Sequence, residues 1–507
     1  MIEHYPSQAL SGLTLAIATI LLLAWARWRS RPTLPLPPGP PSEFLLGHSR
    51  VIPKENAAAV YAKWSKEYNS DIIHVRSLGR STVVLNSADV ARDILDKKGA
   101  NFCDRPRFTL LKIMGWGKTL TFLPFGERWQ MHRKLLQTSF SNTNKPKTWE
   151  TSLRRLAVAI VLQVSYGTQV LEDDDPYIQI ANDAMYATGN GGVPAYSIVD
   201  LVPFVRYLPD CIVRDWSLRF ARQWRWAIKK LHDVPFAAAQ AEYHRDDHHR
   251  NTSLAHHLLR EYKDKEFRGQ EQQWSLDDIK GAAGAVFIAG ADTTWATCVI
   301  FVLNMVLHPE IQEKAQQELD AVIGTDRLPD FSDRPALVYI EHIVQEIYRW
   351  SPLAPLGIPH KSLHDDIYKG MLIPKGISEG KTLSYDAAII MRTVVYANAY
   401  AMAHDERVYK NPHDFNPDRY EAGEPFPVGN FGFGRRVCVG RFLADNSVWI
   451  TVATMLSVLR FCKKMSSDGK PIEPRVRFTN GGTCHPEHFD CVIKPRSLEA
   501  EALVKSD

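Results

Sequence analysis

Apolar residues recur three and four positions apart through most of the chain, a spacing that places them on one face of an α-helix. This pattern predicts helices over 56–69, 87–98, 127–139, 150–165, 217–244, 275–307, 309–323, 335–350 and 442–459. Strand patterns are few. Short β-branched runs at 72–75 and 82–85 suit a hairpin, and further strands are expected near 367–373 and 486–494. We therefore expect a mainly α-helical fold with a minor β-sheet.

The first 27 residues have the pattern of an N-terminal membrane anchor. Positions 5–26 are 22 residues without a formal charge, rich in Leu, Ile and Ala, and such a helix spans a hydrocarbon core of about 30 Å. Arg27, Arg29 and Arg31 follow directly, so the positive-inside rule places the rest of the chain in the cytosol. A cleaved secretory signal is the alternative, but no small-residue cleavage site precedes the basic cluster.

Residues 28–41 are expected to form a basic and proline-rich hinge, because closely spaced prolines exclude both a helix and a central strand. We interpret this segment as a stiff spacer. No internal repeat or charged linker divides the chain after residue 41, so a single catalytic domain is expected over 42–507.

Composition and cysteine usage narrow the function classes. The chain is 45% hydrophobic and 23% charged, and a net charge of only +4 gives no nucleic-acid footprint. Its seven cysteines include no C-x-x-C pair and do not form a regular framework, so disulfide scaffolding is excluded. A functional cysteine must therefore be identified by its neighbours.

Cys438 has unusual neighbours. Glycines at 432, 434 and 440 allow the backbone to approach a flat group closely. Arg435 and Arg436 favour the thiolate, which is the form that binds a metal, and a helix beginning just beyond adds positive potential. An inert loop cysteine is the alternative, but it does not account for this combination.

This segment resembles the heme-ligand signature of the cytochromes P450, F-x-x-G-x-R-x-C-x-G. Its motif positions are occupied by Phe431, Gly434, Arg436, Cys438 and Gly440. The resemblance implies a single-domain cytochrome P450 fold behind the membrane anchor, with heme as the cofactor and Cys438 as the axial thiolate on its iron. A thiolate ligand favours cleavage of the O–O bond of bound dioxygen.

A second motif lies inside the long apolar stretch 275–307, where the sequence AGADTT at 289–294 places an acid and an alcohol that are costly to bury. It is similar to the oxygen-activating kink of the family. The resemblance implies that Gly290 opens space for dioxygen, that Thr293 holds the bound oxygen species by its hydroxyl, and that Asp292 relays protons. A helix N-cap is the alternative, but apolar residues continue on both sides.

Two further motifs agree with the family in order and spacing. Glu346 and Arg349 lie three positions apart, on one helical face. The segment 415–420 resembles the P-E-R-F motif, with Asp418 and Tyr420 as substitutions. The resemblance implies a structural network of Glu346, Arg349 and Arg419 behind the heme.

The resemblance also implies partners for the heme propionates. Trp129 and Arg133 match the W-x-x-x-R position, whose arginine suits a carboxylate. Arg436 and His360 are the other expected partners, although an exposed loop histidine is the alternative for His360. Segments expected to line the substrate pocket lie around 103–123, 201–220, 282–294, 352–358 and 479–485. Their apolar character favours a terpenoid, aromatic or polyketide-like substrate.

The protein implied is a single-pass monooxygenase of the endoplasmic reticulum, which oxidises a small molecule with dioxygen in fungal secondary metabolism. The chain has no G-x-G-x-x-G unit and no flavin domain, so a membrane-bound NADPH-dependent reductase must supply electrons. Candidate docking residues near Cys438 are Arg133, Lys134, Arg435 and Arg441. The alternatives are an isomerase or dehydratase that needs no dioxygen, and an inactive, misspliced product.

Two segments depart from the family pattern. Residues 377–392 separate a strand from the segment that normally comes after it, and we interpret them as a retained intron; a genuine surface insertion is the alternative. The connection 141–149 is short, which leaves the family's fourth helix curtailed and suggests missing coding sequence. Asn251 begins a glycosylation pattern that we expect to be unmodified in a cytosolic domain.

Overall fold

The computed structural model describes residues 34–506, except 45, 54, 78–79, 125–148, 171, 173, 193–196, 214, 244–250, 273 and 378–390. The expected anchor at 5–26 and the helix predicted at 127–139 therefore lie outside the described residues. The described helices are α2 (Ala57–Glu67), α3 (Ala88–Ala91), α4 (Thr109–Met114), α6 (Trp149–Tyr166), α7 (Pro176–Asn190), α8 (Ile198–Leu201), α9 (Trp216–Tyr243), α10 (Leu254–Phe267), α11 (Leu276–Leu307), α12 (Pro309–Val322), α13 (Val338–Trp350), α14 (Ala399–Ala403), α15 (Arg441–Val458) and α16 (Leu498–Ser506).

The sheets are small. The largest has the strand order β1-β2-β8-β3, with β8 parallel to β2 and the other neighbours antiparallel. Two-stranded sheets pair β4 with β5, β6 with β7 and β9 with β10. The strands are β1 (Ile72–Ser77), β2 (Arg80–Leu85), β3 (His360–Lys361), β4 (Asp366–Tyr368), β5 (Met371–Ile373), β6 (Gly376–Ile377), β7 (Met391–Arg392), β8 (Val394–Ala397), β9 (Leu459–Lys463) and β10 (Cys491–Pro495). The expectation of a mainly helical fold with a minor sheet is confirmed.

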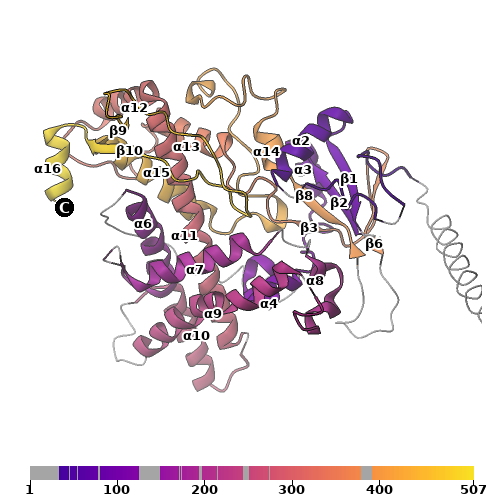
Figure 1. Ribbon diagram of the computed structural model, residues 1–507. Coiled ribbons are helices and arrows are strands. Elements are labelled where there is room, and N and C mark those ends of the chain that lie inside the picture. Colours follow the sequence, from indigo (N-terminus) through magenta and orange to yellow (C-terminus); the bar gives the residue numbers. More distant parts are fainter. Residues whose placement is uncertain are drawn as a thin grey trace, which may run out of the picture.

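Helix α11 runs through the middle of the molecule, with the main sheet at one side and the C-terminal helix α16 at the other (Figure 1). A capping box starts it: the Ser275 hydroxyl accepts from the Asp278 backbone N–H, and the Asp278 carboxylate accepts from the Ser275 N–H. Among the described residues, α11 is the helix long and apolar enough to cross a membrane. However, 61% of its most apolar window is buried inside the protein, so here it is a core helix.

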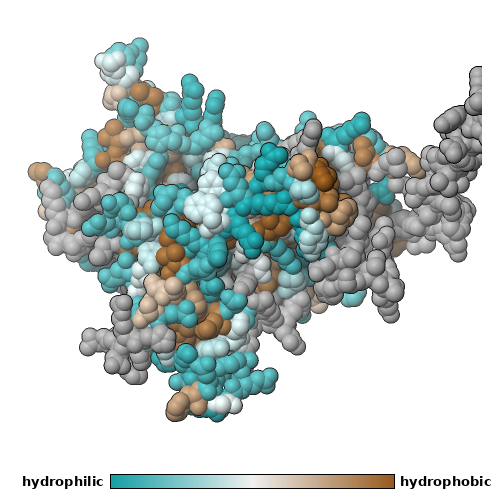
Figure 2. All heavy atoms as spheres, turned by 60° about the horizontal axis from the view of Figure 1, so that its bottom comes forward, coloured by the Kyte–Doolittle hydropathy of each residue, from teal (hydrophilic) through white to brown (hydrophobic). Residues whose placement is uncertain are grey.

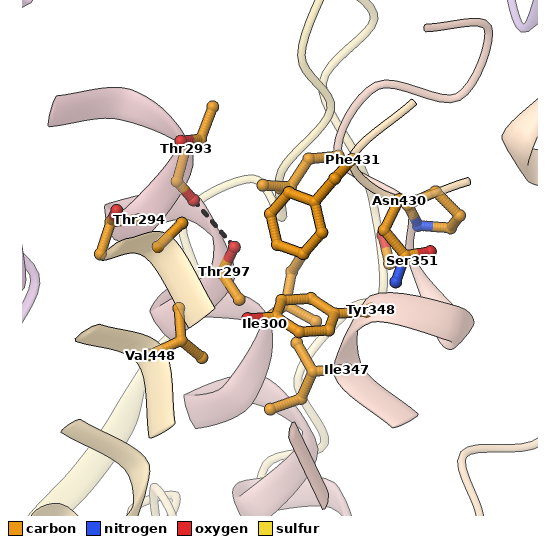
Figure 3. Close-up of a pocket in the computed structure, with 13 residues that line it drawn as sticks. Thr293, Thr294, Thr297, Ile300, Ile347, Tyr348, Ser351, Asn430, Phe431 and Val448 are labelled. Carbon is orange, nitrogen blue, oxygen red and sulfur yellow. Dashed lines mark hydrogen bonds between the residues drawn. The ribbon is translucent and has the colours of Figure 1, made fainter. Parts of the chain in front are cut away.

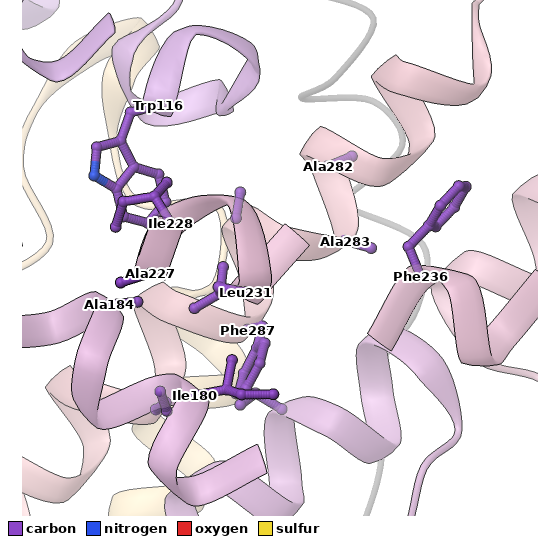
Figure 4. Close-up of a cluster of buried hydrophobic side chains, with 14 of the residues drawn as sticks. Trp116, Ile180, Ala184, Ala227, Ile228, Leu231, Phe236, Ala282, Ala283 and Phe287 are labelled. Atoms are coloured by element: carbon purple, nitrogen blue, oxygen red, sulfur yellow. The ribbon is translucent and has the colours of Figure 1, made fainter. Parts of the chain in front are cut away.

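The two halves of α11 belong to two different cores. The N-terminal half packs with α4, α6, α7, α9 and α10, and Figure 4 shows Phe287 beside Leu231 and Ile180 in this cluster. The C-terminal half packs with α12, α13, α15 and β9, around Phe301, Trp449 and Phe461. Because one continuous helix joins both cores, its central turns are held at a fixed place between them.

Several predicted boundaries differ from the structure. The run at 367–373 is a hairpin of β4 and β5, since Lys369 and Gly370 adopt positive φ and turn the chain. The strand expected at 486–494 is β10, which begins only at Cys491. The helix predicted at 87–98 divides into α3 and a π-helical turn, Arg92–Lys97.

The proline-rich hinge is packed against the sheet, which differs from a spacer that stands free of the body. The Pro35 carbonyl accepts from the Leu372 backbone N–H (2.8 Å), and the Pro38 carbonyl accepts from the His74 N–H (2.9 Å). Proline cannot donate a backbone hydrogen bond, but its carbonyl accepts one normally. Contacts with the body of the protein are therefore already made within the hinge, before residue 42.

The segment interpreted as an insertion leaves and returns at one point of the fold. Strands β6 and β7 pair antiparallel, with Gly376 opposite Arg392, and the Thr393 backbone N–H donates to the Lys375 carbonyl (3.1 Å). Removal of 377–392 would consequently leave two chain ends that already lie side by side. Retained intron and surface insertion both remain compatible with this arrangement.

Both the nitrogen and the oxygen of the Asn251 side-chain amide form hydrogen bonds. Its Nδ2 donates to Glu242 Oε1 (3.2 Å), and its Oδ1 accepts from the Ser253 backbone N–H (3.0 Å). A Cβ on Gly167 would come within 2.1 Å of Asn251 Nδ2, so the amide is closely packed. A glycan on Nδ2 would disrupt this packing, and the unmodified state of the side chain stays a prediction.

Buried charges join α13 to the segment that precedes the cysteine loop. Glu346 and Arg349, both 0% exposed, form a bidentate pair at 2.8 Å, and Arg419 Nε donates to Glu346 Oε1 at 3.1 Å. The Tyr420 hydroxyl donates to Glu346 Oε2 (2.9 Å), and Asp418 pairs with Lys314 (2.7 Å). Both substitutions in the P-E-R-F-like segment thus form bonds of their own, and this tyrosine extends the buried network.

Replacing Glu346 by Ala should lower the free energy of unfolding by about 3–5 kcal/mol, because the buried Arg349 guanidinium loses its counter-charge and Arg419 keeps only its pair with Glu424. Urea unfolding followed by circular dichroism would measure the change. The exposed Lys263–Glu266 pair has the same sequence separation and is the matched control. Glu266→Ala should cost less than about 1 kcal/mol. Equal losses in the two variants would contradict this account of the network.

Candidate active site

The cysteine loop depends on two glycines with positive φ. Gly432 has φ +78° and Gly434 has φ +59°, values that side chains rarely adopt. A Cβ on Gly434 would lie 2.1 Å from the Leu95 carbonyl oxygen, so the loop approaches the Arg92–Lys97 turn too closely for any side chain. The Cys438 backbone N–H then donates to the Phe431 carbonyl (2.7 Å) and closes the loop.

Cys438 is exposed and lies directly before α15, whose N-cap is Gly440. A helix N-terminus favours a thiolate. By contrast, burial raises the pKa of the Cys103 and Cys484 thiols, and it raises that of Cys298 and Cys491 to about 12. These four thiols stay protonated at neutral pH. Among the other three cysteines, Cys438 is the one that lies in the glycine and arginine loop directly before a helix N-terminus, a setting suited to a metal ligand.

A buried cationic cluster lies beside this loop: Arg105 and Arg436 are its cations, and His360 is its third, uncharged member. Each side chain is at most 8% exposed. Arg436 Nε donates to the Cys103 carbonyl (2.6 Å), and Arg105 donates to the Pro359 carbonyl (2.9 Å). Burial and then the neighbouring arginines lower the pKa of His360 to about 3. Burial and then Arg436 lower the pKa of Arg105 well below its usual value.

This cluster has the electrostatics of an anion site. Desolvated cations that repel one another are costly unless a negative group lies among them. Asp104 also lies beside the cluster, but it is paired with Lys361 at 2.5 Å. A ligand that carries carboxylates and lies against the cysteine loop would fit both the buried arginines and the exposed Cys438 thiol.

The sequence predicted two members of the cluster and missed the third. His360 is buried, with its Nδ1 2.8 Å from the Phe102 carbonyl, so the alternative of an exposed loop histidine is wrong. Arg105 was not predicted, because a lone arginine in an irregular segment carries no pattern and only the fold brings it beside Arg436. Trp129 and Arg133 lie outside the described residues.

On α11, Thr293 is half-buried and lies in a stretch that is less buried than the turns on either side. Its hydroxyl donates to the carbonyl of Ala289, and Ala289 is itself exposed in the middle of the helix. Gly290 has a different role from the one implied by the resemblance, since its Cβ would lie 2.2 Å from Val161 Cγ1 of α6. The glycine therefore makes room for helix packing.

Asp292 is held from two sides by residues far away in the sequence. Its Oδ1 lies 3.5 Å from the Arg154 guanidinium of α6, and its Oδ2 accepts from the Thr483 hydroxyl (2.9 Å). The Arg154 guanidinium lies face-on over Trp295, 3.4 Å from the ring centroid. Burial lowers the pKa of Arg154 to about 10, so it stays charged at neutral pH. No sequence pattern linked Arg154 or Thr483 to Asp292.

Helix α11, which carries Asp292 and Thr293, lines one pocket together with the cysteine loop. A cavity of about 50 Å³ lies between α11, α13, α15 and the loop, and Thr293, Thr297, Phe431 and Val448 are among its lining residues (Figure 3). The Thr297 hydroxyl donates to the Thr293 carbonyl (2.8 Å). The fold thus brings together two motifs that lie well over a hundred residues apart in the sequence.

Comparisons with known proteins identify the class of this site. The cytochrome P450 family model matches residues 37–155 and 142–488, so the chain belongs to that family. The two matches overlap at 142–155, next to the short connection at 141–149. The chain is 31% identical to a cytochrome P450 monooxygenase of Armillaria gallica, over 98% of this chain and 99% of that protein.

Other relatives are also fungal. The monooxygenase ple1 of Rhodocybe pseudopiperita is 33% identical over 96% of this chain and 95% of its own length. Tryptamine 4-monooxygenase of Psilocybe cyanescens is 31% identical over 96% of this chain and 98% of its own length.

A zebrafish cytochrome P450 structure has the same fold, with a TM-score of 0.65 and 22% identity over 87% of this chain and 100% of that one. The protein is a monooxygenase, and its cofactor is heme.

The residues present fit a heme. The exposed Cys438 thiol offers an iron ligand, and the buried cations Arg105 and Arg436 suit the two carboxylates of the porphyrin.

Gly434→Ala should reduce heme incorporation strongly, because a Cβ cannot be placed 2.1 Å from the Leu95 oxygen without moving the loop. Gly432→Ala is the matched control in the same loop, since it has a similar φ but nothing within 4 Å. Both variants carry the cost of a positive φ, about 1–2 kcal/mol. Heme absorbance per mole of protein measures the difference, and equal losses would contradict the steric explanation.

Proposed function

We propose that the protein is a membrane-anchored heme-thiolate monooxygenase, which hydroxylates or otherwise oxidises an apolar small molecule with dioxygen and NADPH-derived electrons. One observation carries the proposal: Arg436 belongs both to the loop that presents Cys438 and to the buried cationic cluster. A single short segment therefore offers a thiolate for iron and positive charge for the carboxylates of the same group.

In this proposal Cys438 is the axial ligand, and Arg105, His360 and Arg436 hold the propionates. Trp129 and Arg133, by the family resemblance, complete that set, and Phe431, Gly434 and Gly440 shape the loop. When bound, the heme supplies the activation of dioxygen and the insertion of one oxygen atom into the substrate.

Thr293 and Asp292 are proposed to deliver protons. The hydroxyl of Thr293 lies in the less buried central stretch of α11, where it can hold a proton or pass it to a bound oxygen atom. Asp292 is one residue away, and its carboxylate is fixed by Arg154 and Thr483. Arg154 is thus a positioning residue for the acid. The intact acid and alcohol pair argues against an isomerase or dehydratase, which has no need of proton delivery to dioxygen.

The substrate is proposed to be an apolar small molecule of terpenoid, aromatic or polyketide-like character, within fungal secondary metabolism. The expected lining segments contribute mainly apolar side chains to the first core cluster, among them Phe108, Leu111 and Phe287. One fungal relative is named for an aromatic amine, tryptamine, which supports the aromatic part of this class.

A membrane location in the endoplasmic reticulum is proposed from residues 1–27, with the catalytic domain in the cytosol. The segment between α8 and α9 supports contact with a membrane surface, since Phe204, Tyr207, Ile212 and Trp216 are 61–72% exposed. On the face seen in Figure 2, hydrophobic side chains form separate groups among hydrophilic ones. Electrons are proposed to come from a membrane-bound NADPH-dependent reductase.

The first test is the difference spectrum of the reduced full-length chain under carbon monoxide. A red-shifted Soret band is expected, because a thiolate is the axial ligand. Cys438→Ser should abolish the band, whereas Cys211→Ser, at another exposed cysteine, should keep it. A chain that gives no band would support the inactive, misspliced alternative, and product formation without NADPH and dioxygen would contradict the monooxygenase reaction.

Arg154→Met should lower the amount of product formed per NADPH by about 10-fold, since Asp292 loses its ion pair while a long side chain still covers Trp295. The carbon monoxide band should be unchanged. Product, peroxide and NADPH are measured together, with the solvent isotope effect as the readout of proton transfer. Arg154→Lys should restore part of the product formed per NADPH. An Arg154→Met variant that forms as much product per NADPH as the wild type would exclude this positioning role.

A further inference from the structure

A surface groove lies at the start of α13, here called the α13 groove. It has a volume of about 440 Å³ and is lined by Phe331, Arg334, Pro335, Val338, Glu341, His342 and Phe426. Phe331, Val338 and Phe426 are 47–52% exposed, so the groove presents apolar surface to water. His342 is 8% exposed, and its Nδ1 has no hydrogen-bond partner among the residues that the structure describes.

The groove is built against one face of α15, the helix that follows Cys438. Arg334 donates to Asp445 (2.7 Å) and Asn446 (2.8 Å), and Phe331 lies against Trp449, with 6.2 Å between ring centroids. Positions 442, 445, 446 and 449 lie on one helical face by their spacing. The groove and the first turn of α15 are therefore parts of one continuous surface.

The first turn of that face is apolar and basic. Phe442 is 68% exposed, and the Arg441 guanidinium lies 4.3 Å from its ring centroid. Arg435 is exposed three residues before Cys438. A partner that covers this turn needs acidic groups opposite the arginines and apolar surface opposite Phe442.

The distance along α15 links the groove to electron transfer. At about 1.5 Å per residue, Trp449 lies about 12 Å along the axis from the start of the helix. A specific protein partner buries about 800 Å² on each side, a patch about 30 Å across. A protein that docks over Cys438 to deliver electrons would cover the α13 groove as well.

We infer that the α13 groove is the apolar anchor point for the acidic electron-donor protein, and this inference rests on the proposed function. An aromatic side chain of the donor fits the groove best, because it would fill the apolar space between Phe331, Val338 and Phe426. The arginines near Cys438 steer the donor, and the groove supplies binding energy that salt does not screen.

The test uses the full-length chain with a purified fungal NADPH-dependent reductase in the same lipid vesicles. Val338→Glu places a charge in the groove, and Ile367→Glu is the matched control, because both side chains are 52% exposed and β-branched. Reduction of the heme is followed by stopped flow over a range of reductase concentrations. The apparent Kd for the reductase should rise about 5-fold or more in Val338→Glu and stay unchanged in Ile367→Glu.

Phe426→Ala, which adds no charge, should change the apparent Kd in the same direction. At high salt the effect of Val338→Glu and Phe426→Ala should persist, whereas that of Arg441→Ala should shrink. Dithionite-reduced spectra under carbon monoxide should match the wild type in every variant. Groove variants with the same apparent Kd for the reductase as the wild type would overturn the inference. A wild type that shows the carbon monoxide band but accepts no electrons from the reductase would overturn it as well. A wild type without the band would instead overturn the proposed function.

Discussion

Buried positive charge beside a cysteine is the constraint on which the site depends. Arg105 and Arg436 lie in the interior together, and burial with their mutual repulsion lowers the pKa of the Arg105 guanidinium well below its usual value. Folding places them there through bonds to backbone carbonyls, which satisfy donors but cancel no charge. In the proposed complex the heme carboxylates complete the charge balance of the site, which would link heme binding to the stability of this region.

Helix α11 connects the two cores at the place where the chemistry occurs. Its two halves are fixed in these cores, and the central stretch with Ala289 and Thr293 is less buried than the turns on either side. The acid in that stretch does not stand alone, because α6 and the loop before β10 both contact Asp292. The position of Asp292, and with it the proposed proton delivery, consequently depends on two distant segments.

The segments that depart from the family pattern contain none of the motif residues. Both ends of 377–392 meet beside β8, so its length is accommodated at the edge of the fold without displacing the sheet. The overlap of the family matches at 142–155 coincides with the short connection before α6. Helix α6 still packs against α11 through Val161 and Gly290, so the core retains this contact.

Local patterns in the sequence determined the helices, the cysteine loop and the Glu346–Arg349 pair, because each depends on residues a few positions apart. Periodicity predicted α6, α9, α11, α12 and α13 to within about three residues, and the F-x-x-G-x-R-x-C-x-G motif marked Cys438. The tertiary structure alone decided that Arg105 joins Arg436, that Arg154 and Thr483 hold Asp292, and that Gly290 serves packing. These contacts join segments that lie more than a hundred residues apart in the sequence. Only the packing of the whole chain creates them, and a single sequence carries no periodic signal for such pairs.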